Sequence, residues 1–289
     1  MTNPKYPLFI VSKGRADSRY TARYLDYMKV PYRLVIEPSE YDMYLKHVKD
    51  KNKLLELDMS YKEKYDTCDD LGLTKSTGPG PARNFIWDYS IKEGYDYHWV
   101  MDDNIRSFRR YNLNEKVKVS SGTIFKAMED FVLRYENVGM AGPNYYMFQP
   151  ARNKTPPFIL NTRIYSCNFI KNDLPYRWRG RYNEDTILSL DMLTNGLCTI
   201  QFNAFLQEKI TTQSVRGGNS EEFYDKEGTL EKSKMQLKVY PDISKVVKRF
   251  NRIHHYVDYS QFKINKLIRK KDINLNKNKY DMTLKRVPL

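Results

Sequence analysis

A short apolar segment that ends in acidic residues constrains the fold of this sequence more than any other feature. Residues 97–101, Tyr-His-Trp-Val-Met, predict a buried strand, and Asp102, Asp103 and Asn104 follow it directly. Open α/β sheets bind ligands at the carboxyl edge of their strands. Adjacent carboxylates repel each other unless a cation lies between them, and Mg²⁺ and Mn²⁺ favour such oxygen ligands. The alternative is a solvated turn, because Asp and Asn are common in turns.

Strands and helices alternate before this motif, which predicts an α/β fold with parallel strand pairing. Residues 8–11 and 32–37 predict strands, with a helix over residues 18–29 between them and another from Ser39 to about residue 48. Further along the chain, we expect helices over residues 80–93, 123–135, 184–195 and 228–239, strands over 138–141, 159–170 and 197–210, and a polar connection over 106–118.

The acidic strand end resembles the core of the GT-A glycosyltransferases. A Gly/Pro-rich turn, Gly78-Pro79-Gly80-Pro81, an Ala82-Arg83-Asn84 helix start and one helix precede the strand. In GT-A enzymes the acidic motif, often Asp-x-Asp, binds the metal that holds a nucleotide-sugar diphosphate. The resemblance implies a GT-A type Rossmann-like, mostly parallel central sheet flanked by helices, with a UDP-sugar as co-substrate.

The same resemblance implies a divalent metal, Mn or Mg, at this edge. Its ligands are expected from Asp102, Asp103 and Asn104, although an amide here stands at the third position of the motif. Many GT-A chains add a late histidine ligand, for which His254 and His255 are the candidates; a stacked or structural histidine is the alternative. The nucleotide-sugar is expected to contact loops near the strand ends, at Ser12, Lys13, Gly14, Arg15, Glu37, Arg83, Asn84, Asp102, Arg216, Gly217 and Gly218.

A second motif lies at residues 175–186, where an Arg/Trp-rich loop leads into Glu184 and Asp185 at the start of a helix. Acidic residues in a first helical turn favour the helix dipole without any catalytic role, which is the simpler interpretation. GT-A enzymes carry a Glu-Asp pair at this place, and in inverting members a carboxylate there is the catalytic base. The resemblance implies that Asp185 is the base, with Glu184 in support. We expect the helix dipole to lower the pKa of Asp185.

Charge is unevenly distributed along the 289 residues. Residues 231–289 carry 16 Lys/Arg against 5 Asp/Glu, an excess of 11 out of the total of +14. This division predicts a catalytic domain over residues 1–230 and a basic, helical C-terminal region over 231–289 that packs on it and contacts a polyanion. A merely solubilising tail is the alternative. The residues expected to bind DNA are Arg177, Trp178, Arg179, Arg181, Lys248, Arg249 and Arg252.

The motifs together are similar to those of the phage glycosyltransferases associated with TET/JBP-type dioxygenases, relatives of the base J glucosyltransferase. The resemblance implies transfer of a sugar from a UDP-sugar to a 5-hydroxymethyl pyrimidine in double-stranded phage DNA, and we expect the sugar to be glucose and the base to be 5-hydroxymethylcytosine. The alternatives are a transferase acting on a cell-surface or lipid-linked glycan and a non-catalytic nucleic-acid-binding module. The sequence shows no span long enough to cross a membrane and no signal-peptide pattern, which predicts a cytoplasmic protein, in the host cell if phage-encoded.

Overall fold

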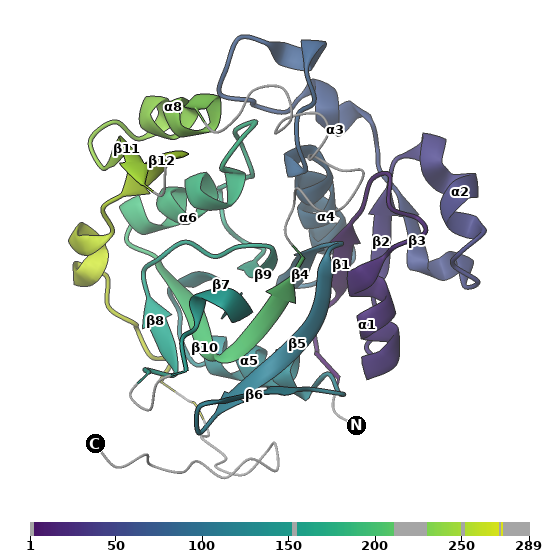
Figure 1. The fold of residues 1–289 in the computed structure, drawn as a ribbon, viewed down its shortest axis with the longest axis horizontal. Coiled ribbons are helices and arrows are strands. Elements are labelled where there is room, and N and C mark those ends of the chain that lie inside the picture. Colours follow the sequence, from purple (N-terminus) through teal and green to yellow (C-terminus); the bar gives the residue numbers. More distant parts are fainter. Residues whose placement is uncertain (1–2, 152–154, 211–229, 250–251, 272, 274–289) are drawn as a thin grey trace.

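The computed structural model describes residues 3–151, 155–210, 230–249, 252–271 and 273. A ten-stranded sheet lies between two layers of helices (Figure 1). Its strands are β1 (Leu8–Val11), β2 (Arg33–Ile36), β3 (Leu54–Glu56), β4 (Tyr97–Asp102), β5 (Ile105–Asn112), β6 (Glu115–Lys118), β7 (Val138–Tyr145), β8 (Phe158–Leu160), β9 (Cys167–Lys171) and β10 (Cys198–Lys209). The α-helices are α1 (Tyr20–Met28), α2 (Tyr41–Leu45), α3 (Ser60–Glu63), α4 (Gly80–Lys92), α5 (Thr123–Val132), α6 (Glu184–Thr194) and α8 (Leu230–Val239).

The sheet has the order β3-β2-β1-β4-β9-β7-β10-β5-β6, and β8 pairs with β10. Seven strands share one direction, whereas β5, β8 and β9 run against them. This confirms the predicted fold class, a mostly parallel Rossmann-like sheet flanked by helices. The carboxyl ends of β1, β2 and β4 therefore meet at one edge.

Apolar residues fill both faces of the sheet because successive residues in a strand point to opposite sides. In β1, Leu8 and Ile10 pack with α1, α2 and α5, whereas Phe9 packs with α4 and α6. In β4, Trp99 belongs to the first layer and Val100 to the second. A strand that is buried on both faces holds its end in a fixed position, and β4 ends in Asp102.

Two sequence-based expectations were wrong. Residues 106–118 form the hairpin β5–β6, with Leu113 and Asn114 at positive φ in its turn, rather than a polar connection. The polar sequence of β5 conceals a strand, because Ile105, Ser107 and Phe108 are buried and Arg109 pairs with Glu208 of β10. Residues 159–170 are likewise two strands, β8 and β9, separated by a turn that includes Asn161 at positive φ.

The C-terminal region begins with α8, as predicted, but then forms an antiparallel hairpin of β11 (Ser244–Arg249) and β12 (Arg252–Val257). Within the described part of this region, helix is therefore limited to α8 and a short 3-10 helix at Ser260–Ile264. Leu190 and Leu193 of α6 form a small apolar cluster with Val257 and Phe262. Tyr240 adds a hydrogen bond from its hydroxyl to Asp191. These contacts attach the region to the helix that begins with Glu184 and Asp185.

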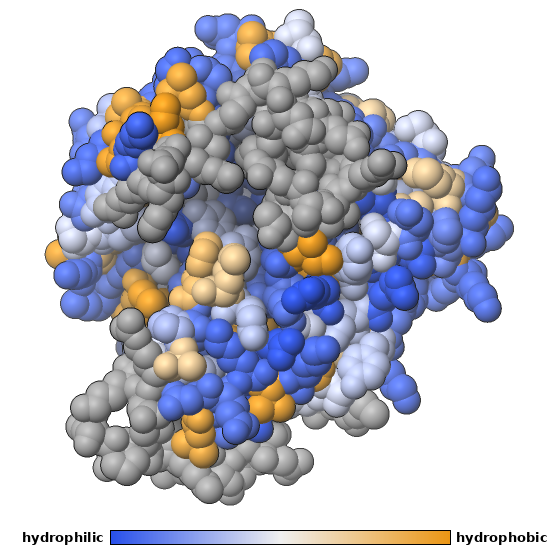
Figure 2. All heavy atoms as spheres, in the orientation of Figure 1, coloured by the Kyte–Doolittle hydropathy of each residue, from blue (hydrophilic) through white to orange (hydrophobic). Residues whose placement is uncertain are grey.

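No helix in the described ranges is long and apolar enough to cross a membrane. On the face drawn in Figure 2, hydrophilic residues dominate the described surface and hydrophobic residues form small separate groups.

Candidate active site

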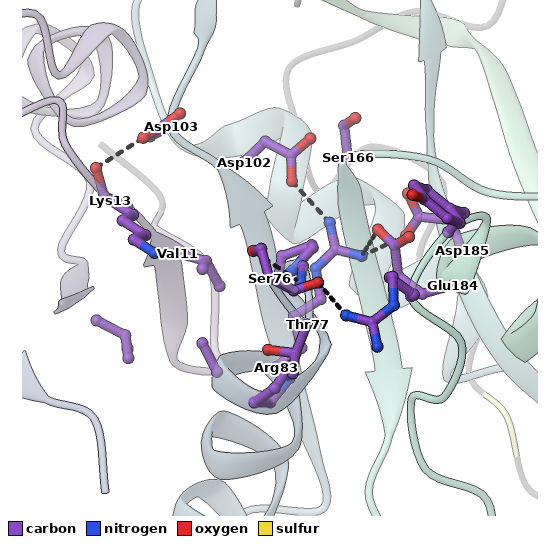
Figure 3. A pocket seen from close by; sticks show the side chains of 18 of the residues that line it. Val11, Lys13, Ser76, Thr77, Arg83, Asp102, Asp103, Ser166, Glu184 and Asp185 are labelled. Atoms are coloured by element: carbon purple, nitrogen blue, oxygen red, sulfur yellow. Dashed lines mark hydrogen bonds and ion pairs between the residues drawn. The ribbon is translucent and has the colours of Figure 1, made fainter. Parts of the chain in front are cut away.

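A cleft of about 790 Å³ opens at the edge where β1, β2 and β4 end. Helix α4, the start of α6 and the loop of residues 73–79 close its other sides. Figure 3 shows how the polar side chains gather there. The cleft therefore lies where open α/β sheets bind their ligands.

Thr21, in the first turn of α1, fixes the turn after β4 through three hydrogen bonds. Its hydroxyl donates to the carbonyl oxygen of Asp102 at 2.6 Å and accepts the N–H of Ile105 at 2.9 Å. Its own N–H donates to the carbonyl oxygen of Asp103 at 3.1 Å. These bonds fix the backbone of the acidic turn, and the carboxyl groups of Asp102 and Asp103 point to different neighbours (Figure 3).

The carboxylate of Asp102 lies between two cations. Arg83 Nη2 donates to Oδ1 at 2.7 Å, and Lys209 Nζ donates to Oδ2 at 2.7 Å. Burial by itself raises the pKa of Asp102, but Lys209 and Arg83 outweigh it and hold this pKa well below its usual range. Asp102 is therefore ionised at neutral pH.

The carboxylate of Asp103 is turned toward the loop after β1. Ser12 Oγ donates to Oδ2 at 2.7 Å, and Arg15 forms an ion pair with Oδ1. Ser12 is bonded in turn to the hydroxyl of Tyr44 in α2 at 2.6 Å. Asp103 is 4% exposed, and its burial raises its pKa against the opposing effect of Arg15. Asp103 thus ties the loop after β1 to the acidic turn.

The predicted metal ligands do not fit a metal site. Protein donors already bind all four carboxylate oxygens of Asp102 and Asp103, so the buried Oδ1 of Asn104 is the one side-chain oxygen of these three residues without a hydrogen-bond donor, and one oxygen alone does not make a metal site. His254 and His255 lie on β12 and do not line the cleft. Burial lowers the pKa of His255 to about 4. Among the described residues there is no group of three or more His, Cys, Asp or Glu placed to hold a metal ion.

Arg83, in the first turn of α4, is the centre of the site. Its guanidinium, 2% exposed, forms ion pairs with Asp102 at 2.7 Å, Asp185 at 2.8 Å and Glu184 at 3.2 Å. It also lies over the ring of Trp178, 4.5 Å from its centroid. One buried cation therefore connects the acidic end of β4 to the acidic start of α6.

Asp185 differs electrostatically from the sequence-based expectation. Its burial raises its pKa to about 7; Arg83 opposes the shift, while Glu184 and Asp102 add to it. The expected lowering by the helix dipole was wrong, because three carboxylates share the Arg83 guanidinium in a buried place. Asn168 donates to Asp185 Oδ1 at 3.3 Å. A carboxyl group with a pKa near neutrality suits proton transfer.

The residues predicted to bind the nucleotide-sugar fall into three groups. Those that line the cleft are Ser12, Lys13, Arg15, Glu37, Arg83 and Asp102. Gly14, with φ +66°, does not line it, but its N–H donates to Glu40 Oε1 at 2.8 Å. Asn84 was predicted wrongly, because its side chain exchanges two hydrogen bonds with the backbone of Trp178, at 2.8 and 2.9 Å. Arg216, Gly217 and Gly218 lie outside the described residues.

The Arg/Trp loop was partly misinterpreted as a DNA-binding segment. Trp178 is 1% exposed beneath Arg83, and the Arg181 side chain is fully buried in an ion pair with Asp69 at 2.7 Å, so neither presents a surface to DNA. Arg181 also donates to the carbonyl oxygens of Gly72 and Lys75 at 2.7 and 2.9 Å. It thereby anchors the loop that covers the cleft.

Arg177 and Arg179 remain partly exposed. They pair with Asp88 at 2.9 Å and with Asp191 at 2.6 Å, beside a second cleft of about 690 Å³. Lys248 is exposed on β11, and the side chains of Arg249 and Arg252 lie outside the described part of the chain. The site also contains residues that sequence reasoning missed, which are Lys209, Ser166, Asn168, Tyr145 and Tyr165. Lys209 could have been found from the sequence, because it lies at the end of a long predicted strand, where ligands bind.

A Rossmann-like sheet whose acidic strand end faces a helix that begins with Glu-Asp has the arrangement of the GT-A fold. The family model of the TET-Associated Glycosyltransferases matches residues 6–218, well over half of the chain. The chain belongs to this family and is a nucleotide-sugar-dependent glycosyltransferase. No curated protein shows a significant match to it.

Proposed function

We propose that the protein transfers glucose from a UDP-sugar to the hydroxymethyl oxygen of 5-hydroxymethylcytosine in double-stranded DNA. The family supports transfer of a sugar in connection with TET-type base modification. The observation that carries the proposal is the position of Asp185, a buried carboxyl group with a pKa raised to about 7 on the wall of the cleft. A primary alcohol is a poor nucleophile until a nearby base takes its proton.

In this reaction the acceptor oxygen forms a bond to C1 of the sugar, and the bond between C1 and the phosphate oxygen breaks. The electron pair of that bond leaves with the diphosphate, and the acceptor proton goes to the carboxylate of Asp185. Arg83 holds Asp185 in place and is a positioning residue in this scheme, whereas Glu184 supports the geometry through the same guanidinium.

The donor end of the cleft is assigned to the loops after β1 and β2. Ser12 and Lys13 follow β1, and Glu37 follows β2, where it pairs with Lys13 at 3.4 Å and with Lys62 at 2.6 Å. A pyrimidine base offers donors and acceptors along one edge, which suits such a mixed rim of charged and hydroxyl groups.

The acceptor end is assigned to an aromatic wall. The rings of Tyr145 and Tyr165 lie parallel, with centroids 5.8 Å apart and an interplanar angle of 8°. Arg163 lies over Tyr165 at 5.0 Å, and Phe148, which is 57% exposed, also lines the cleft. Flat rings beside a cation can stack on a nucleobase. Since Asp185 is only 8% exposed, we propose that the acceptor base leaves the duplex to reach it.

The test is an assay with radiolabelled UDP-glucose and three acceptors: hydroxymethylated duplex DNA, the same duplex with plain cytosine, and a glycan. Each reaction is run with and without Mn²⁺. We expect label on the hydroxymethylated duplex alone. Label on the glycan alone would favour a glycan transferase, and absence of transfer from any of several nucleotide-sugars would overturn the donor assignment.

A further inference from the structure

We propose that Lys209 takes the place of a divalent cation at the donor diphosphate, so that this enzyme transfers sugar without a metal ion. The proposal rests on the proposed function, because it concerns the diphosphate of the same donor. It departs from the metal site that the sequence resemblance implies.

The position of Lys209 follows from the alternation of side chains along β10, next to an irregularity in the pairing of β10 with β5. The pairing between β10 and β5 shifts register between Glu208 and Lys209. The partners of these two residues are Ser107 and Ile105, so the extra residue of the bulge is Arg106 in β5. Glu208 points to one face of the sheet, where it accepts from Ser107 Oγ and pairs with Arg109 of β5 at 2.8 Å. The next residue, Lys209, faces the cleft instead.

The ammonium of Lys209 is held where it can meet a phosphate. It donates to Asp102 Oδ2 at 2.7 Å and to Ser166 Oγ at 2.8 Å (Figure 3 labels both acceptors). An ammonium has three N–H donors, so one remains for a ligand. The side chain is 19% exposed, which leaves the group in contact with the cleft. Asp102 therefore orients the ammonium group of Lys209 rather than a metal ion.

A metal ion at Asp102 would compete with the groups already there. Arg83 binds Oδ1 and Lys209 binds Oδ2, so an ion that coordinated either oxygen would lie beside a positive charge. Asp103 supplies no second ligand toward the cleft, because Ser12 and Arg15 bind its two oxygens. A metal site needs an excess of oxygen ligands over cations, and this strand end has the opposite arrangement.

Among the described residues, the lining of the cleft carries an excess of positive charge. Nine of its residues are Lys or Arg and six are Asp or Glu. The departing nucleoside diphosphate gains negative charge as the glycosyl bond breaks, and fixed cations in a partly buried site stabilise that charge without reorganising. Lys209 is the cation among them that Asp102 and Ser166 orient at the end of β4 and β10.

The first experiment measures binding of UDP, GDP and inorganic pyrophosphate by calorimetry, in EDTA and in Mn²⁺ or Mg²⁺. Wild-type protein is expected to bind UDP in EDTA with a Kd within about twofold of that in metal, because Lys209 supplies the cation. Binding that appears only when Mn²⁺ or Mg²⁺ is added would overturn the proposal.

The second experiment uses variants of Lys209. Lys209→Met should weaken UDP and pyrophosphate binding in EDTA by roughly 10- to 100-fold, the effect of losing a hydrogen bond from a charged donor. Lys209→Arg should keep most of the affinity, and Lys92→Met, an exposed residue at the end of α4, should change nothing. Thermal melting verifies that each variant is folded. Unchanged affinity in folded Lys209→Met would refute the assignment.

The experiments can contradict the proposed function and the proposed role of Lys209 independently of each other. Diphosphate binding in EDTA that depends on Lys209, without sugar transfer to DNA, would contradict the proposed acceptor and support the proposed role of Lys209. Transfer to hydroxymethylated DNA that stops in EDTA and resumes in Mn²⁺ would support the proposed function and contradict the proposed role of Lys209. Transfer that continues in EDTA and falls in Lys209→Met would support both.

Discussion

The guanidinium of Arg83 lies 4.5 Å from the centre of the Trp178 ring, and this contact closes one side of the buried charge network. Because the ring covers one face of the guanidinium, the edges of that group are left for Asp102 and Asp185. The backbone of Trp178 is fixed in turn by two hydrogen bonds with Asn84, the next residue after Arg83. Adjacent residues of α4 therefore position the same loop by two different interactions.

Replacing Arg83 should destabilise the fold strongly. Arg83→Met leaves the buried carboxylates around Asp185 without their shared cation, which costs about 3–5 kcal/mol in comparable buried pairs. The free energy of unfolding in urea measures the loss, and Arg23→Met, on the exposed side of α1, is the matched control. A loss below about 1 kcal/mol would show that solvent, rather than Arg83, neutralises these groups.

The rate of transfer should depend on the ionisation of Asp185. The carboxyl must be deprotonated to accept the acceptor proton, and burial raises its pKa to about 7. We therefore expect kcat to be low below this pH, to rise through about pH 7 and to level off above it. A pH–rate profile under saturating donor and acceptor measures this. A flat profile between about pH 5.5 and 8.5 would mean that another group is the base.

Asp185→Asn should separate binding from turnover. The amide keeps the size of the side chain but cannot take a proton, so turnover should fall by about 10²- to 10⁴-fold while UDP binding is retained. Glu184→Gln is the matched variant, because Glu184 also pairs with Arg83. If Glu184→Gln alone is inactive, Glu184 is the base.

Asp103 should act on the donor rather than on the chemical step. Its carboxylate holds Ser12 and Arg15, so Asp103→Asn should loosen the loop after β1. We expect the donor KM to rise by roughly 10- to 100-fold, with a smaller change in kcat. Steady-state kinetics with varied UDP-sugar measures this. A fall in kcat at unchanged KM would instead assign Asp103 to the transition state.

DNA affinity should fall steeply with salt, since cations that bind phosphates release counterions. For each phosphate that a variant no longer neutralises, the slope of log K against log salt should become shallower by about 0.9. Lys248→Glu, at an exposed position on β11, tests whether the C-terminal hairpin takes part. Filter binding over a range of salt concentrations measures the slope. An unchanged slope in this variant would show that Lys248 does not bind a DNA phosphate.

The parts of the site that follow from local pattern were predictable. Apolar periodicity and an abrupt acidic boundary indicate both the buried strand that ends at Asp102 and the helix that begins at Glu184. The meeting of the two at Arg83 was not predictable, because it depends on crossovers that bring α4 and α6 to the same side of the sheet.

Burial of polar sequence was the main source of error. The segment of residues 177–181 looks like an exposed basic loop, yet Trp178 and Arg181 are buried. Their partners, Arg83 and Asp69, lie about a hundred residues earlier in the chain, so the local sequence does not reveal these contacts. Likewise, a dipole argument for Asp185 considers one helix, whereas its pKa reflects the desolvation and the neighbouring charges of three elements.

The pairing of β10 with β5 determines which side chain faces the active site at the end of β10, and protein engineers could change it. Because side chains alternate along a strand, a one-residue change in pairing exchanges the residues that face the cleft and the neighbouring strand. Inserting a single residue just before Glu208, with the earlier pairing of β10 kept, would move Glu208 to the position of Lys209 and turn a carboxylate toward Asp102. The same backbone would then carry an acidic cluster, and the choice between a cationic and a metal-binding active site would reside in the length of one strand.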